Sequence, residues 1–139
     1  MITRDMKQFV QVQTSERLKK LESELKNAFD LPEDPDAIHD LRVAIRRLNQ
    51  TLRVFTNWFD AHRIRKLRGR LKKLMERCAA VRNCDIAIEV LKAAEWQDEA
   101  VHQGLEKERT HTHKKLHKTM PKLHHGHRGR WSKVPGVDH

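Results

Sequence analysis

A row of cationic side chains repeats along the stretch between residues 38 and 59. His39, Arg42, Arg46 and Arg53 follow one another at intervals of three, four and seven residues, which places them in one sector of an α-helix. Like charges at these spacings repel, so the row weakens the helix unless an anion lies along it. Guanidinium groups stay charged and present a planar set of donors that suits phosphate. The row is about 21 Å long at about 1.5 Å per residue, which fits a long polyanion better than one small anion.

The same stretch carries the apolar face that must hold this row in place. Its apolar residues alternate three and four apart, as on one side of a helix: Ile38, Leu41, Ile45, Leu48, Leu52, Phe55 and Phe59. The prolines at 32 and 35 mark a turn, after which Asp34 or Asp36 can cap the helix. This helix is predicted to continue to about residue 59, where Trp58 and Phe59 close its apolar face.

Three further helices are expected from the same periodicity. One covers about residues 3–29, and another begins near residue 64 after a reversal at 60–63. A break is expected at 82–85, with Asn83 or Asp85 capping a continuation to about residue 94. A helix from about 96 to 120 has a thinner core face, made of Trp96, Val101, Leu105, Thr112 and Leu116. The prediction is an all-α protein, an antiparallel four-helix bundle over residues 1–120 with a mobile, basic, His-rich tail at 121–139.

Composition limits the class of protein and of partner. A length of 139 residues suits one compact domain, and the net charge of +10 favours nucleic acid, polyphosphate or an acidic membrane surface as partners. The absence of Tyr argues against stacking of single-stranded bases. No apolar run suggests a signal peptide or a membrane span, so we expect a cytoplasmic protein with no membrane partner. Cys78 and Cys84 are expected to be reduced and packed near the end of the third helix.

Two motifs resemble those of the CHAD family, the histidine-containing α-helical domains. The string HDLRVAIRRL at 39–48 is similar to the signature of the family's opening helix, and AVRNCDI at 80–86 is similar to the turn after its next long helix. Asn49 and Asn83 depart from the family pattern. The resemblance implies a pair of four-helix bundles that bind inorganic polyphosphate along basic surfaces. It covers only one bundle, so the chain is expected to work as half a module or to pair, either with a second copy or with another CHAD-like half.

The row and the resemblance together predict a set of polyphosphate-binding residues. His39, Arg42, Arg46 and Arg53 come from the row, Arg47 comes from the family motif, and a second set is expected to supply a facing wall: Lys73, Arg82, Arg109 and His113. Lys73 belongs to a further basic row on the third helix and is chosen by the family pattern. Arg82 has two readings of equal weight, since it could contact the ligand or hold the turn by pairing with Asp85.

Binding without chemistry explains the sequence better than an enzyme does. Hydrolysis or transfer of phosphate normally recruits a metal through acidic residues, and Asp40, Glu76 and Asp85 form no evident cluster. His113 and His117 are four apart, but no Cys or paired carboxylate joins them, so we predict no structural metal site and no cofactor, only weak adventitious metal binding. The alternative function is a nucleic-acid-binding helical bundle without sequence preference. If the protein binds polyphosphate, we also expect it to associate with polyphosphate granules.

Overall fold

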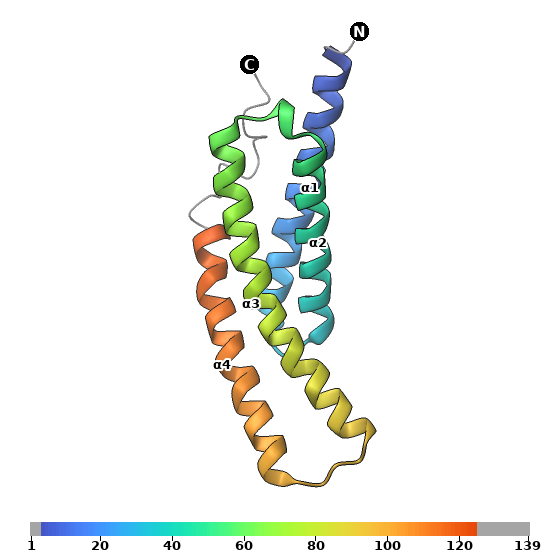
Figure 1. Cartoon of the computed structure of the whole chain (residues 1–139), viewed down its shortest axis with the longest axis vertical. Helices are drawn as coiled ribbons and strands as arrows, with labels where there is room; N and C mark the ends of the chain where they lie inside the picture. The colour runs from blue at the N-terminus through green and yellow to red at the C-terminus, as the bar shows by residue number, and fades with distance from the viewer. Residues whose placement is uncertain (1–3, 125–139) are drawn as a thin grey trace.

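The computed structural model describes residues 4–124, where four α-helices alternate in direction along the chain (Figure 1). They are α1 (Arg4–Asp30), α2 (Pro35–Val54), α3 (Ala61–Ala93) and α4 (Glu99–His124), and the short 3-10 helix η1 (Thr56–Trp58) precedes α3. The part of the chain that the structure describes contains no strand, so the predicted all-α bundle is confirmed. The predicted tail begins at residue 121, but α4 continues to His124, and residues 125–139 lie outside the described residues.

The apolar face predicted for α2 forms the centre of the core. Ile38, Leu41, Ile45, Leu48 and Leu52 are all inaccessible to solvent. They pack among buried residues of the other helices, which include Leu18, Leu21, Leu25, Leu71, Leu74 and Leu116. Burial of side chains of this size stabilises a fold by about 1.5–3 kcal/mol each, so this face fixes the side of α2 that is left for solvent.

The prediction that the second helix reaches residue 59 is wrong. α2 ends at Val54, where the chain changes to the 3-10 helix η1 and the Trp58 amide donates to the Phe55 carbonyl at 2.9 Å. The Thr56 hydroxyl lies 2.9 Å from the carbonyls of Leu52 and Arg53 and supplies a donor at the end of the helix. Phe59 nevertheless stays in the core after the turn of η1. At the other end, the Asp34 carboxylate accepts from the Asp36 amide at 2.9 Å, so Asp34 is the cap.

The predicted break at residues 82–85 is also wrong, because α3 runs without interruption from Ala61 to Ala93. No Gly or Pro interrupts this part of the helix. Asp85, which was expected to cap a new helix, is buried and points its carboxylate at Arg109 of α4. The chain turns later, at Glu95, which has a positive φ of 53°.

The hairpin of α3 and α4 extends beyond the turn between α1 and α2 (Figure 1). Arg109 marks the level of that turn, because it donates both to Asp85 and to the carbonyl of Pro32. Residues 86–108 therefore lie past the end of α1 and α2, by about 12 Å judged from the eight residues of α3 involved. We call this segment the overhang.

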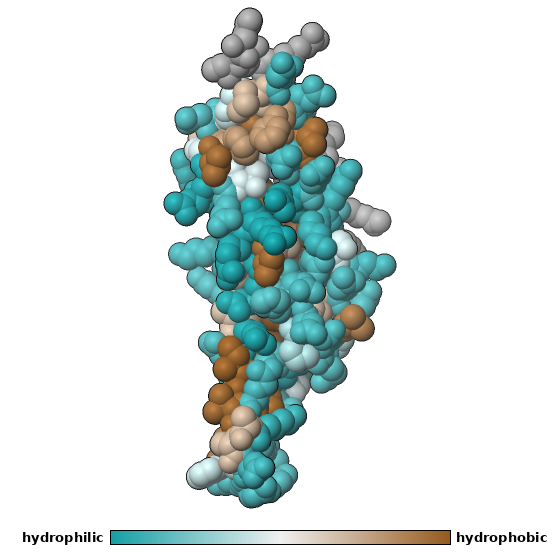
Figure 2. Space-filling model, turned by 90° about the vertical axis from the view of Figure 1, so that its right-hand side faces the viewer, coloured by the Kyte–Doolittle hydropathy of each residue, from teal (hydrophilic) through white to brown (hydrophobic). Residues whose placement is uncertain are grey.

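Apolar side chains remain exposed on the overhang. Val90 is 60% exposed, Trp96 53%, Ile86 42% and Val101 39%. Figure 2 shows apolar side chains gathered along one edge of the protruding end. The assignment of Trp96 and Val101 to the core was therefore wrong, because no helix of the α1–α2 pair reaches far enough to cover them.

Both cysteines are free and buried, as predicted. Burial raises the pKa of the Cys78 thiol to about 12, while the nearby Arg42 charge acts in the opposite direction. This influence places the Arg42 guanidinium close to α3. Within the described ranges, none of the helices is long and apolar enough to cross a membrane.

Candidate functional site

Five basic side chains share the side of α2 that faces away from the core. His39, Arg46, Arg47 and Arg53 are exposed, and Arg42 is half-buried. Together they cover about 140° of helical rotation, from Arg42 beside α3 to Arg47 on the side of α1. We call these five residues the α2 basic face. The structure thus brings together five of the nine residues predicted from the sequence.

No ion pair found among residues 4–124 involves the α2 basic face. The ion pairs found there join Lys20 to Glu24 and Arg109 to Asp85, and none involves the five residues. After Asp40, α2 contains no acidic residue. The Nε atom of Arg42 is buried and has no hydrogen-bond partner among the described residues. A helix that carries such a row gains stability when an anion binds along it.

On the α1 side, the face continues into a pocket of about 390 Å³. Its charged lining consists of four basic residues, His39, Arg47, Arg17 and Lys20, and two acidic residues, Asp40 and Glu24. Sequence reasoning treated Arg17 and Lys20 as ordinary solvated charges and missed this contact. The signal was present, because a helical hairpin that turns near residue 32 places residue 20 opposite residue 45. Lys20 is partly neutralised by Glu24 at 3.0 Å, whereas Arg17 is not in either ion pair found in residues 4–124.

On the α3 side, the helical register places Arg82 on the same side of α3 as Cys78, toward this face. Arg82 follows Cys78 by one turn, and Cys78 lies close to Arg42. Asp85 accepts from Arg109, and no hydrogen bond or ion pair joins Asp85 to Arg82 within residues 4–124. The structure therefore gives no support to the hypothesis that Arg82 holds a turn.

Lys73 lies on a different side of α3. It precedes Cys84 by eleven residues, which is about three helical turns, so the two residues share one side of the helix. The Cys84 sulfur is 3.9 Å from the Thr112 hydroxyl of α4, which identifies that side as the one facing α4. Lys73 is exposed there and is separate from the α2 basic face.

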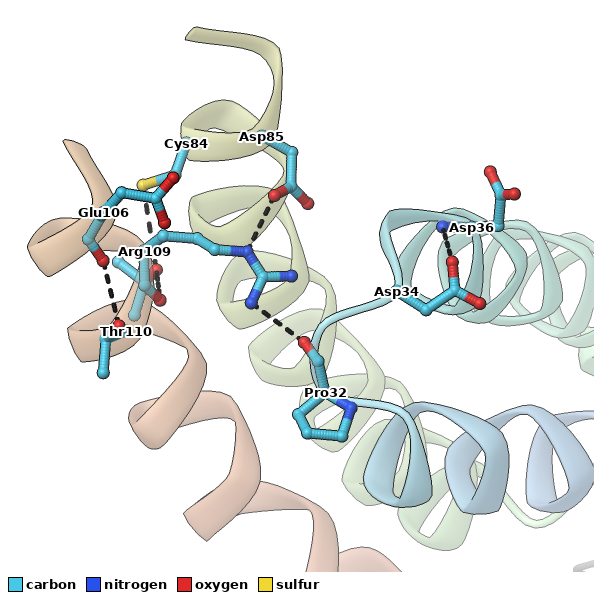
Figure 3. Close-up of polar contacts among 9 residues, drawn as sticks. Pro32, Asp34, Asp36, Cys84, Asp85, Glu106, Arg109 and Thr110 are labelled. Carbon is cyan, nitrogen blue, oxygen red and sulfur yellow. Dashed lines mark hydrogen bonds and ion pairs between the residues drawn. The ribbon is translucent and has the colours of Figure 1, made fainter. Parts of the chain in front are cut away.

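Arg109 is a structural residue in the interior. Its Nε donates to Asp85 Oδ1 at 2.8 Å and its Nη1 donates to the Pro32 carbonyl at 2.9 Å, with 7% of the residue exposed (Figure 3). The side chain therefore ties α4 to α3 and to the α1–α2 turn. It does not join the α2 basic face as its sequence position had suggested.

His113 is buried beside Arg109, one turn further along α4. Its ring centroid is 6.1 Å from that of His117, and His117 stacks on Phe29 of α1 at 4.1 Å. These contacts pack the inner side of α4 against α1. Across the described ranges, no group of three or more His, Cys, Asp or Glu side chains is placed to hold a metal ion.

Stability is expected to depend on pH through His113. Burial lowers the pKa of His113 first, and the charges of Arg109 and His117 lower it further, although Glu33 and Asp85 act against them. The unfolded chain then binds the proton more readily, so this contribution is present above about pH 6.5 and is lost as the pH falls through the folded pKa. The free energy of unfolding is measured with urea at about pH 7.5 and at about pH 5. Its decrease between the two pH values should be smaller for His113→Gln than for the parent chain. Equal losses in both proteins would contradict this assignment.

A family model described as the CHAD domain matches residues 13–127 of the chain. The chain belongs to the CHAD family. The resemblance stated from the two motifs is therefore confirmed over most of the sequence. No curated protein and no solved structure matches the chain. The matched range of this CHAD domain contains the whole α2 basic face and both residues of the Asp85–Arg109 pair.

Proposed function

We propose that this CHAD domain binds inorganic polyphosphate along the α2 basic face and performs no chemistry on it. The observation that carries the proposal is the set of five basic side chains on one side of one helix, none of which is in an ion pair found in the described residues. Domains of the CHAD family are known to bind polyphosphate, which supports this ligand over other polyanions.

The geometry suits a chain of phosphates more than a single one. From His39 to Arg53 the face is about 21 Å long, so several phosphates can be contacted at once. Arg17 extends the positive surface on the α1 side, where Lys20 is paired with Glu24, and Arg82 extends it toward α3. Each arginine can donate more than one charge-assisted hydrogen bond to phosphate oxygens. Because several phosphates are neutralised together, counterions are released and the affinity should fall steeply with salt.

Competition with nucleic acid tests the proposal. Labelled long-chain polyphosphate is bound at near-physiological salt, and duplex or single-stranded nucleic acid is added at equal phosphate concentration. We expect polyphosphate to stay bound, and we expect orthophosphate at the same phosphate concentration to compete poorly because it makes few contacts. Complete displacement by nucleic acid would refute polyphosphate as the preferred ligand and favour the nucleic-acid alternative.

A further inference from the structure

The two ends of this elongated molecule carry opposite charge. The overhang, residues 86–108, has six acidic and two basic side chains, a net charge of −4. At the opposite end, residues 53–70 have six basic side chains and one acidic side chain, a net charge of +5. We call this second segment the basic end. Both segments include part of α3, so one continuous helix of 33 residues holds them at a fixed separation (Figure 1).

Both ends also expose apolar side chains. On the overhang these are Val90, Trp96, Ile86 and Val101, as described above. At the basic end Val54 is 74% exposed, and Phe9 of α1, which is 49% exposed, lies edge-on against Phe55 with ring centroids 6.0 Å apart. Exposed apolar groups that gather among charged residues are typical of surfaces that bind another protein.

We infer that the overhang docks on the basic end of a second copy of this chain, with the two molecules antiparallel. A twofold axis then brings the acidic, apolar end of each copy against the basic, apolar end of the other. Both overhangs and both basic ends are covered, so the dimer is closed. Direct pairing of two overhangs would place −4 against −4, which opposes it. A second copy is chosen as the partner because the chain itself supplies the complementary charge and apolar surface.

The inference does not depend on the proposed polyphosphate site. The docking surfaces share only Arg53 with the α2 basic face, so either proposal can fail while the other holds. The two are also read out differently, because self-association is measured without any ligand.

A charge-exchange experiment tests the pairing. The full chain is studied by sedimentation equilibrium, where two 16.5 kDa chains are expected per particle. Glu89→Lys with Glu106→Lys brings the net charge of the overhang from −4 to 0, and Arg63→Glu with Lys66→Glu brings that of the basic end from +5 to +1. All four side chains are exposed. Each double variant alone should associate at least about tenfold more weakly than the parent. An equimolar mixture of the two should form a heterodimer that is tighter than either homodimer. One of its contacts keeps the parental net charges of −4 and +5, and the other sets the introduced lysines against the introduced glutamates.

Lys19→Glu with Lys26→Glu is the matched control, since it reverses two exposed charges of α1 away from both ends. It should leave self-association unchanged. A parent chain that is monomeric at all concentrations would overturn the inference. So would a mixture that fails to associate although each variant is folded by circular dichroism, or a parent chain that grows into open polymers instead of stopping at two copies.

Discussion

Replacing Arg42 and Arg46 together by alanine should weaken polyphosphate binding by roughly 10- to 100-fold. Each guanidinium that contacts phosphate contributes about 0.7–1.4 kcal/mol net, so the two together contribute about 1.4–2.8 kcal/mol, and about 1.4 kcal/mol corresponds to a factor of ten. Neither side chain is in an ion pair among residues 4–124, so the loss is expected to appear in binding and not in stability. The dependence of affinity on salt should also become shallower, by about 1.4–1.8 in the logarithmic slope for two lost phosphate contacts.

The control removes the same charge elsewhere. Lys114→Ala with Lys115→Ala takes two exposed positive charges from α4, away from the α2 basic face. If binding reflects only the net charge of +10, both double variants will lose affinity equally. Polyphosphate titrations that give the same dissociation constant for the Arg42/Arg46 variant and the parent chain would remove α2 as the site.

Asp85→Ala should be the most destabilising single substitution of a polar residue in this chain. It leaves the Arg109 guanidinium buried with no carboxylate, and breaking a buried pair in this way costs about 3–5 kcal/mol. The contact is a single bond between Nε and Oδ1, so about 3 kcal/mol is the more reasonable figure. A domain of this size is stable by about 5–15 kcal/mol, and we expect the melting temperature to fall by roughly 10 °C.

Thermal unfolding followed by circular dichroism measures this effect. Glu76→Ala provides the comparison, because it removes an exposed carboxylate from the same helix. That variant should change stability by less than about 0.5 kcal/mol. If the two variants melted together, the Asp85–Arg109 pair would contribute little, and another contact would have to hold α4 to α3.

Much of the fold was predictable because the core of α2 follows helical periodicity with almost no exceptions. Ile38, Leu41 and Ile45 are buried where the spacing placed them, and the solvent side of the helix followed from that. The helix ends were less predictable. α2 gives way to η1 five residues before the predicted end, and the apolar spacing, which continues to Phe59, gives no indication of this change.

The site was predictable only within a single helix. His39, Arg46 and Arg53 share a face because of their spacing alone, which is a local property. The residues chosen for a facing wall depended on how α3 and α4 are rotated, which the sequence leaves open. Arg109 and His113 lie in register with Leu116 and Thr112 on α4, so the helix could bury them once Asp85 supplied a partner for the arginine.

The prediction of core residues on the overhang was wrong for another reason. Trp96 and Val101 have the spacing of core residues, yet burial also requires a neighbour at the same height in the bundle. The α1–α2 pair ends at the level of Pro32, which the contact of Arg109 with that residue marks on the α3–α4 hairpin.

The contact of Arg109 with the α1–α2 turn uses a main-chain carbonyl as its acceptor. Any amino acid at position 32 would present the same carbonyl oxygen, so the contact with Arg109 does not depend on the side chain at that position. The contact depends on the position of the backbone, which an added or deleted residue between Asp30 and Pro35 would shift. This turn is therefore expected to accept substitutions, as surface loops usually do, but to resist the changes of length that such loops usually tolerate.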